Sequence, residues 1–257
     1  GGVSILKMSD SRIHRWFLSA FLLISTLVVT GAIAQSHEAE SGSLREVQGR
    51  VTLIFANSHA SVTDASKVVY WLVPPGGNVA PRVPNDQRTY QMAQRNKSFQ
   101  PNMLVVPVGT AVDFPNYDPW FHNVFSLYRG KRFDLGLYEA GSRKQVVFDR
   151  LGPSYIFCNI HPQMHAVVLA VDSEYFGISD KAGRVSIADV PSGKYELHVW
   201  YENAAPKSLE ALKRGVEISE GNRPLPPVAI SAVKQDPMKR TNKYGEGYDP
   251  ADQTVAY

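Results

Sequence analysis

The chain has 257 residues, a formal net charge of +3 and a single cysteine. Its length suits one large or two small domains, and its composition is that of a soluble globular protein. The small charge gives no indication of nucleic acid as a partner. One cysteine excludes an internal disulfide and, within one chain, a four-cysteine zinc site, a cysteine-ligated iron–sulfur cluster and a two-cysteine dinuclear copper site.

The first 34 residues have the pattern of a signal peptide. Arg12 and Arg15 form a basic flank, and a mostly apolar run of 14 residues extends from Trp16 to Val29. Residues 32–34 read Ala-Ile-Ala, the small-x-small pattern of a signal-peptidase site. We therefore expect removal of residues 1–34 and a periplasmic mature protein with no membrane insertion. An uncleaved anchor is the alternative, although the run is short for a spanning helix.

Strand signals dominate after residue 45. The runs are short, rich in Val, Ile, Tyr and Phe, and bounded by Gly, Pro, Asn and Asp. They are Val47–Phe55, Lys67–Val73, Met103–Val108, Thr110–Phe114, Lys144–Phe148, Tyr155–Cys158, His165–Val171, Arg184–Ile187 and Lys194–Tyr201. This pattern predicts an all-β sandwich or barrel. A short helix is expected over Ser208–Arg214, and residues 233–257 are expected to form a flexible tail.

A candidate metal site lies in the string from Cys158 to Met164, which has the spacing C-x2-H-x2-M with His161 in the middle. Thiolate and imidazole suit copper, and a thioether is a soft, weak ligand. A further histidine, His122, lies 36 residues before the cysteine. Two His, one Cys and a long axial Met are the ligands of a mononuclear blue-copper site. The alternatives are a buried inert cysteine, a structural histidine and a core methionine.

The remaining histidines are expected to lie outside this site. His165 follows Met164 directly and should point away from it, because adjacent side chains of a strand face opposite sides. His198 alternates with apolar residues and is expected on the other face of its sheet. His37 and His59 fall in polar segments and are expected to be solvated.

From Asn96 to Val171 the chain resembles the cupredoxins. The matching segments are Phe99–Pro101, Leu104–Asn116, Asp118, His122–Val124 and Tyr155–Met164. The ligand loop is similar to that of amicyanins, and Phe133–Gly136 with Cys158–Pro162 resembles a periplasmic, methylamine-utilisation-like subgroup.

The resemblance implies a Greek-key sandwich over residues 88–172 that holds one type 1 copper. His122, Cys158 and His161 would be its equatorial ligands and Met164 the axial one. It also implies that His122 comes from a loop. By the same resemblance, the Asn123 N–H bonds the cysteine sulfur and the Asn123 side chain ties the two ligand loops together.

A second module surrounds the first in the sequence. Residues 180–187 (D-x-x-G-R-φ-x-φ, with φ apolar) and 189–200 (V-P-x-G-x-Y-x-φ-x-φ) resemble a carboxypeptidase-regulatory or transthyretin-like β-sandwich. We expect the copper module to be inserted into a split sandwich formed by residues 45–80 and 173–220. The alternative is one enlarged cupredoxin. Pairing of the 47–54 strand with strands in 184–220 would favour the split.

The expected function is periplasmic one-electron transfer to and from an unidentified redox partner protein, with no catalysed reaction. Nothing resembles a second copper site of three histidines, so a copper oxidase or nitrite reductase is not expected. Trp120 and Phe121 would either form a docking collar or seal the copper from water. One alternative is a copper chaperone or store, which a flexible Met/His-rich segment would favour. Another is a non-redox binding module on a cupredoxin scaffold.

Overall fold

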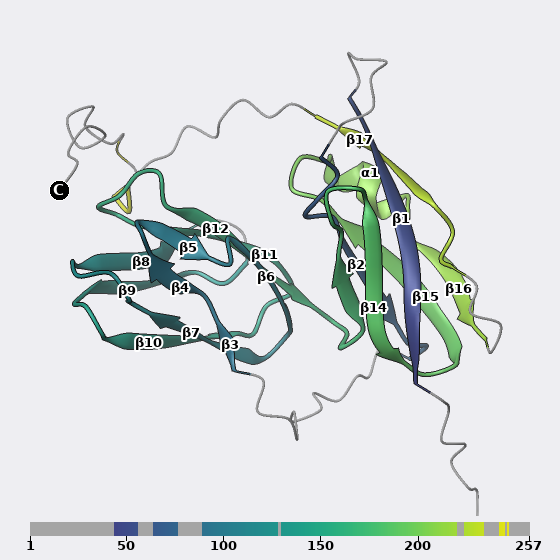
Figure 1. The fold of residues 1–257 in the computed structure, drawn as a ribbon, viewed down its shortest axis with the longest axis horizontal. Coiled ribbons are helices and arrows are strands. Elements are labelled where there is room, and N and C mark those ends of the chain that lie inside the picture. Colours follow the sequence, from purple (N-terminus) through teal and green to yellow (C-terminus); the bar gives the residue numbers. More distant parts are fainter. Residues whose placement is uncertain are drawn as a thin grey trace, which may run out of the picture. The chain divides into compact units, whose positions relative to one another are not determined.

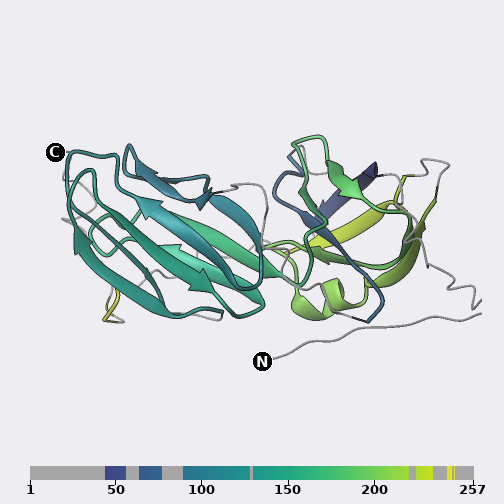
Figure 2. The same cartoon turned by 90° about the horizontal axis from the view of Figure 1, so that it is seen from below.

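A computed structural model describes residues 44–55, 64–76, 89–127, 130–219, 224–233, 242–244 and 246. These residues form short strands and one helix, α1 (Pro206–Glu210), so the predicted all-β class is confirmed (Figures 1 and 2). The expected signal segment, His37 and His59 lie outside the described residues, as does most of 233–257. No helix in the described ranges is long and apolar enough to cross a membrane.

Residues 90–171 form a two-sheet sandwich (Figure 1). One sheet has the order β6-β12-β11-β8-β9 and comprises β6 (Met103–Pro107), β8 (His122–Ser126), β9 (Phe133–Tyr138), β11 (Gly152–Phe157) and β12 (His165–Val171). The other has the order β10-β7-β3 and comprises β3 (Tyr90–Gln91), β7 (Thr110–Pro115) and β10 (Arg143–Phe148). A hairpin of β4 (Ala93–Arg95) and β5 (Ser98–Gln100) precedes β6.

The sequence of these strands explains their places in the sandwich. β10 alternates exposed and buried residues and turns Val146 and Phe148 into the core, as a half-exposed strand should. β12 is an apolar run whose residues from Ala166 to Val171 are all buried, as expected for a strand covered on both faces. Its partners are antiparallel β11 and parallel β6.

The strands on either side of this segment pair with one another. One sheet has the order β14-β1-β17 and comprises β1 (Arg45–Phe55), β14 (Arg184–Val190) and β17 (Val228–Ala232). The other has the order β13-β2-β15-β16 and comprises β2 (Val69–Val73), β13 (Phe176–Ile178), β15 (Gly193–Trp200) and β16 (Arg214–Ile218). The first half of β1 pairs with β14 and its second half runs parallel to β17. The pairing expected between the 47–54 strand and segment 184–220 is therefore present.

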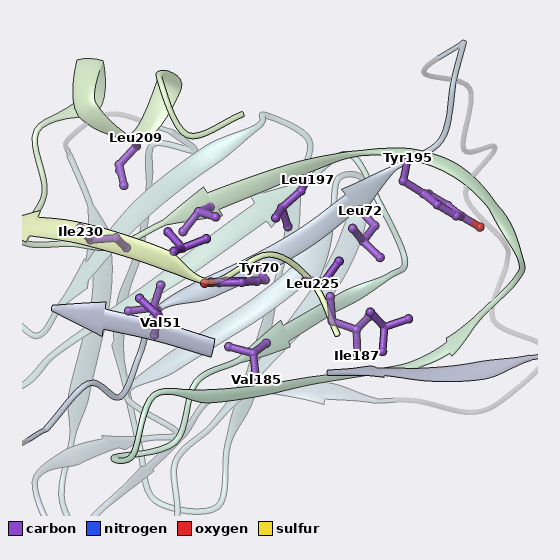
Figure 3. Packing of buried hydrophobic residues seen from close by; sticks show 14 of the residues in the cluster. Val51, Tyr70, Leu72, Val185, Ile187, Tyr195, Leu197, Leu209, Leu225 and Ile230 are labelled. Carbon is purple, nitrogen blue, oxygen red and sulfur yellow. The ribbon is translucent and has the colours of Figure 1, made fainter. Parts of the chain in front are cut away.

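The two outer sheets share one apolar core. Figure 3 shows Tyr70 of β2 and Leu197 of β15 facing Val185 of β14. Tyr70 is fully buried, and its hydroxyl donates to the Arg50 carbonyl at 3.1 Å. Burial of such side chains contributes about 1.5–3 kcal/mol each relative to exposure.

The turn before β14 requires a glycine. Gly183 has φ +74°, and a Cβ there would lie 2.2 Å from the Val51 carbonyl oxygen. The Asp180 carboxylate accepts a hydrogen bond from the Arg184 N–H at 2.9 Å and closes the turn. The D-x-x-G-R pattern therefore has a steric and a hydrogen-bonding reason.

The helix begins two residues earlier than predicted. α1 covers Pro206–Glu210 instead of Ser208–Arg214. Proline at the first helical turn has φ already fixed near the helical value and lacks an N–H that would need a partner. It therefore favours the earlier start.

Candidate metal centre

The predicted ligands lie on or directly after two adjacent strands. Cys158 directly follows β11, and His161 lies in the turn between β11 and β12. His122 was expected in a loop, and the structure instead makes it the first residue of β8. β8 pairs with β11 through Phe125 and Phe157, which brings the two ligand-bearing segments together.

The loop from Cys158 to Met164 is closed by backbone hydrogen bonds. The Met164 N–H donates to the His161 carbonyl at 3.0 Å, and the Cys158 N–H donates to the Met164 carbonyl at 3.4 Å. Met164 is 1% exposed and Cys158 is fully buried, and both belong to the core of this sandwich. The methionine therefore lies on the inner side of the loop.

Cys158, His122 and His161 converge on one point. The cysteine Sγ lies 3.8 Å from His122 Nδ1 and 3.7 Å from His161 Nδ1, and the two nitrogens are 3.1 Å apart. The point equidistant from the three atoms is about 2.1 Å from each, a metal–imidazole bond length. In the described part of the chain this is the one group of three such side chains close enough to hold a metal. The donor set therefore fits a trigonal metal site.

Asp118 orients the first histidine. His122 Nε2 lies 2.8 Å from Asp118 Oδ2, and both side chains are buried. The carboxylate also accepts the N–H groups of Asn96 at 2.6 Å and Lys97 at 2.9 Å. Burial alone would raise the pKa of Asp118, but these hydrogen bonds hold it below its usual value. An ionised Asp118 requires the proton on Nε2, so the Nδ1 lone pair points at the ligand cluster.

Both clustered histidines are neutral at neutral pH. Burial lowers the pKa of His161 to about 4, and the neighbouring His122 adds to the effect. Burial also lowers the pKa of His122, against the opposing influence of Asp118. Neutral imidazole is the form that binds metal, so little proton competition is expected at these two rings.

The environment of Cys158 favours its protonated thiol form while no metal is bound. Burial raises the pKa of Cys158, against hydrogen bonds from the N–H groups of Asn123, Ile160 and His161. Those three donors are aimed at the sulfur and would stabilise it as a thiolate ligand. The N–H bond from Asn123 that the resemblance implies is therefore present.

The Asn123 side chain does not tie the two ligand segments together directly, contrary to expectation. Its Nδ2 donates to Asp134 Oδ1 of β9 at 2.7 Å. Asp134 was not foreseen in this role. Its Oδ1 also accepts the Gly136 N–H at 2.9 Å.

The other described histidines are outside the cluster. His165 is exposed, and its Nδ1 lies 3.3 Å from the Gln163 carbonyl, so it points away as predicted. His198 lies on β15, where its Nε2 contacts Glu196 Oε1 at 2.5 Å.

Exposed apolar side chains lie close to the clustered residues in the sequence. Phe121, which precedes His122, is 56% exposed, and Ile160, which precedes His161, is 40% exposed. Tyr117 is 50% exposed, with the Arg95 guanidinium 4.9 Å from its ring centroid. Trp120 is partly buried, with Lys97 Nζ 5.1 Å from its ring centroid. Phe121 therefore belongs to the surface, whereas Trp120 is partly shielded.

No protein-family model matches this chain, and no curated protein does. Among solved structures, it is similar to a purple cupredoxin from Nitrosopumilus maritimus, with 26% identity over 32% of this chain and 99% of that one, at a TM-score of 0.30. A copper-containing nitrite reductase from Thermus scotoductus SA-01 is 24% identical over 32% of this chain and 22% of that one, at a TM-score of 0.31. A reduced amicyanin variant is 18% identical over 40% of this chain and 98% of that one, also at 0.31.

Proposed function

We propose that this protein is an exported, mononuclear type 1 copper protein that carries single electrons between partner proteins. The observation that carries the proposal is the convergence of Cys158 Sγ with the Nδ1 atoms of His122 and His161. Met164, buried on the inner side of the same loop, is the proposed axial ligand. Copper supplies the one-electron Cu(I)/Cu(II) couple when bound.

The donor set favours copper over the other common metals. A thiolate and two imidazoles in a trigonal arrangement, with a weak axial thioether, are typical of electron-transfer copper sites. Structural zinc sites are closed by four strong ligands, and the described residues near this cluster offer three. Hard cations such as Ca²⁺ and Mg²⁺ require several oxygen ligands, which this cluster lacks.

The protein's contribution would be to hold its ligands in one arrangement in both oxidation states. His122 is fixed on a strand and by Asp118, Cys158 by three N–H donors, and His161 by a closed turn. Such fixed ligands lower the reorganisation that accompanies each electron transfer. Exposed Phe121 and Ile160 would give a partner an apolar contact beside the histidine ligands.

Copper titration of the purified protein tests the proposal. With Cu(II), we expect an intense thiolate-to-copper absorption band in the visible that saturates at one copper per chain and is bleached and restored by a reductant and an oxidant. Cys158→Ser should abolish the band. His165→Asn is the matched control, because it removes a histidine next to the loop that points away from the cluster.

Two outcomes would contradict the proposal. A colourless protein that holds only Cu(I) would indicate copper storage or delivery. An unchanged spectrum in Cys158→Ser would place the metal elsewhere.

A further inference from the structure

A lysine near the end of the chain contacts the surroundings of both ligand-bearing segments. The Lys243 backbone N–H donates to Asn159 Oδ1 at 2.9 Å, and its Nζ lies 3.0 Å from Asp134 Oδ2. Asn159 follows Cys158 in the chain. Asp134 in turn accepts the side chain of Asn123, which follows His122.

These contacts connect the residue that follows one proposed ligand with the residue that follows another. The connection passes from the Cys158 side through Asn159, Lys243 and Asp134 to Asn123 on the His122 side. Since the Asn123 side chain is bonded to Asp134, the connection between the segments that it was expected to make passes through Lys243. The sequence separation is 84 residues to Asn159 and 109 residues to Asp134.

The segment that carries Lys243 is a local turn held by its own hydrogen bonds. Asn242 Oδ1 accepts the N–H groups of Tyr244 at 2.9 Å and Glu246 at 3.0 Å. The Asn242 N–H donates to the Glu246 carbonyl at 2.7 Å. The turn therefore presents the Lys243 N–H and side chain together, so that one residue engages two partners.

The charges support the contact. The Lys243 and Asp134 side chains are 24% and 36% exposed, so the pair is partly shielded from water. The hydrogen bond to Asp134 raises the pKa of Lys243, which keeps the lysine charged at neutral pH. Burial would raise the pKa of Asp134, but bonds from Gly136, Asn123 and Lys243 hold it below its usual value.

We propose that Lys243 is a positioning residue for the metal centre, which links the Cys158 loop to the His122 strand and restrains opening of that loop. Only the effects expected in the copper-bound protein rest on the proposed function. Restraint of the loop is a property of the metal-free protein and can be measured there. Lys243 touches no ligand atom and acts through Asn159 and Asp134.

The single, fully buried cysteine provides the metal-free measurement. Alkylation of Cys158 by iodoacetamide requires the loop to open, so its rate reports how well the loop is held. Lys243→Met removes the ion pair with Asp134 and keeps the backbone N–H, whereas Asn159→Ala removes the oxygen that accepts this N–H. We expect each to accelerate alkylation about three- to tenfold, the range for loss of one hydrogen bond. Lys243→Arg should restore most of the protection.

Lys131→Met is the matched control. Lys131 pairs with Asp149 at 2.8 Å and is 26% exposed, close to the exposure of Lys243. Its partner lies beyond β10, so the substitution removes a comparable ion pair without touching Asn159 or Asp134. Its alkylation rate should equal that of the wild type.

The double variant separates a bridge from two independent contacts. If Lys243 connects the two segments, loss of either of its contacts breaks the connection. The double variant Lys243→Met with Asn159→Ala should then react no faster than the faster single variant. Rates that multiply in the double variant would contradict a bridge. Wild-type rates in both single variants would overturn the proposal, as would acceleration that merely follows a lowered melting temperature.

Copper-loaded protein gives the second measurement. We expect Lys243→Met and Asn159→Ala to release copper to a chelator faster than the wild type and Lys131→Met, and to shift the visible band. Unchanged release and spectrum would contradict a role in positioning the ligands. If the wild type forms no coloured copper site, the proposed function fails while the alkylation rates still test Lys243.

Discussion

Asp118 and His122 face each other across 2.8 Å between carboxylate Oδ2 and ring Nε2, and neither side chain is more than 4% exposed. The pair determines which ring nitrogen is free, because the carboxylate accepts only from a protonated Nε2. The lone pair on Nδ1 is then directed toward Cys158 and His161. A carboxylate four residues before the histidine thus sets the form in which His122 meets a metal.

Replacing Asp118 by Asn should weaken copper binding. Both carboxylate oxygens accept N–H groups, so the Asn amide must turn its NH2 toward one of these donors. We expect copper affinity to fall about 10- to 100-fold, the usual effect of losing such an outer partner. Competition with a Cu(I) chelator measures it. Asp149→Asn, at an exposed ion pair, is the control, and equal affinities in the two variants would contradict the role of Asp118.

Replacing Met164 by Leu should leave the fold and raise the reduction potential. The two side chains have similar volumes, so the free energy of unfolding should fall by less than about 1.5 kcal/mol. Loss of the weak thioether donor and its replacement by an apolar group should disfavour Cu(II). A tenfold change in the ratio of Cu(I) to Cu(II) affinity corresponds to about 59 mV. Cyclic voltammetry beside a thermal melt gives both quantities, and a wild-type potential would remove Met164 from the ligand set.

The metal-free protein should lose stability on acidification below the ordinary histidine pKa. The unfolded chain takes up protons on His122 and His161 near pH 6.5, whereas the folded His161 does so only near pH 4. Stability due to these groups is therefore complete above pH 6.5 and falls between pH 6.5 and 4, by at most about 1.4 kcal/mol per pH unit for each ring. Urea unfolding at several pH values measures the slope. His161→Asn should reduce it and His165→Asn should not.

A charge at the apolar surface should slow electron exchange without altering the metal site. Phe121→Lys places a cation at an exposed position directly before His122 in the chain, and two copies of the variant that meet through this surface would do so with like charges. We expect the electron self-exchange rate, measured by NMR line broadening, to fall at least about tenfold at low salt. Leu151→Lys changes a leucine of equal exposure before β11, at the end of that strand opposite Cys158, and should leave the rate unchanged. A shifted visible band in Phe121→Lys would show that the ligands themselves had moved.

Alanine at Gly183 should destabilise the sandwich of β1, β2 and β13–β17. The new Cβ would lie 2.2 Å from the Val51 carbonyl, and the positive φ adds strain. We expect a loss of about 2–4 kcal/mol, seen as a lower denaturant midpoint. Gly215→Ala meets no atom within 4 Å and is the control, with an expected change within about 0.5 kcal/mol. Equal denaturant midpoints in Gly183→Ala and Gly215→Ala would mean that the turn accommodates a Cβ at residue 183 without loss of stability.

The sequence predicts the strands that consist of a short apolar run. β6, β10 and β12 appear where Val-rich runs place them, and the C-x2-H-x2-M spacing predicts the loop from Cys158 to Met164. β8 and β9 are not predicted. All five residues of β8 are buried, including His122, Asn123 and Ser126, and their burial depends on partners such as Asp118 and Asp134 that only the folded chain supplies.

The outer hydrogen bonds of the site are the least predictable part. Asp118 is present in the cupredoxin-like pattern, but nothing in the spacing says that it would meet His122 Nε2. Lys243 lies in a segment without apolar periodicity, and its partners are 84 and 109 residues away. Contacts of this kind depend on the path of the whole chain, whereas a ligand loop of seven residues depends on local geometry.

The pairing of β1 has a consequence for the order of events during synthesis. Both of its partners, β14 and β17, lie far downstream, whereas β3 to β12 pair only among themselves in the described residues. At about 5–20 residues per second, β1 leaves the ribosome roughly 9–35 s before β17. The segment with His122, Cys158 and His161 can thus close while β1 and β2 still lack their later partners. For that interval their unpaired edges are open to other chains.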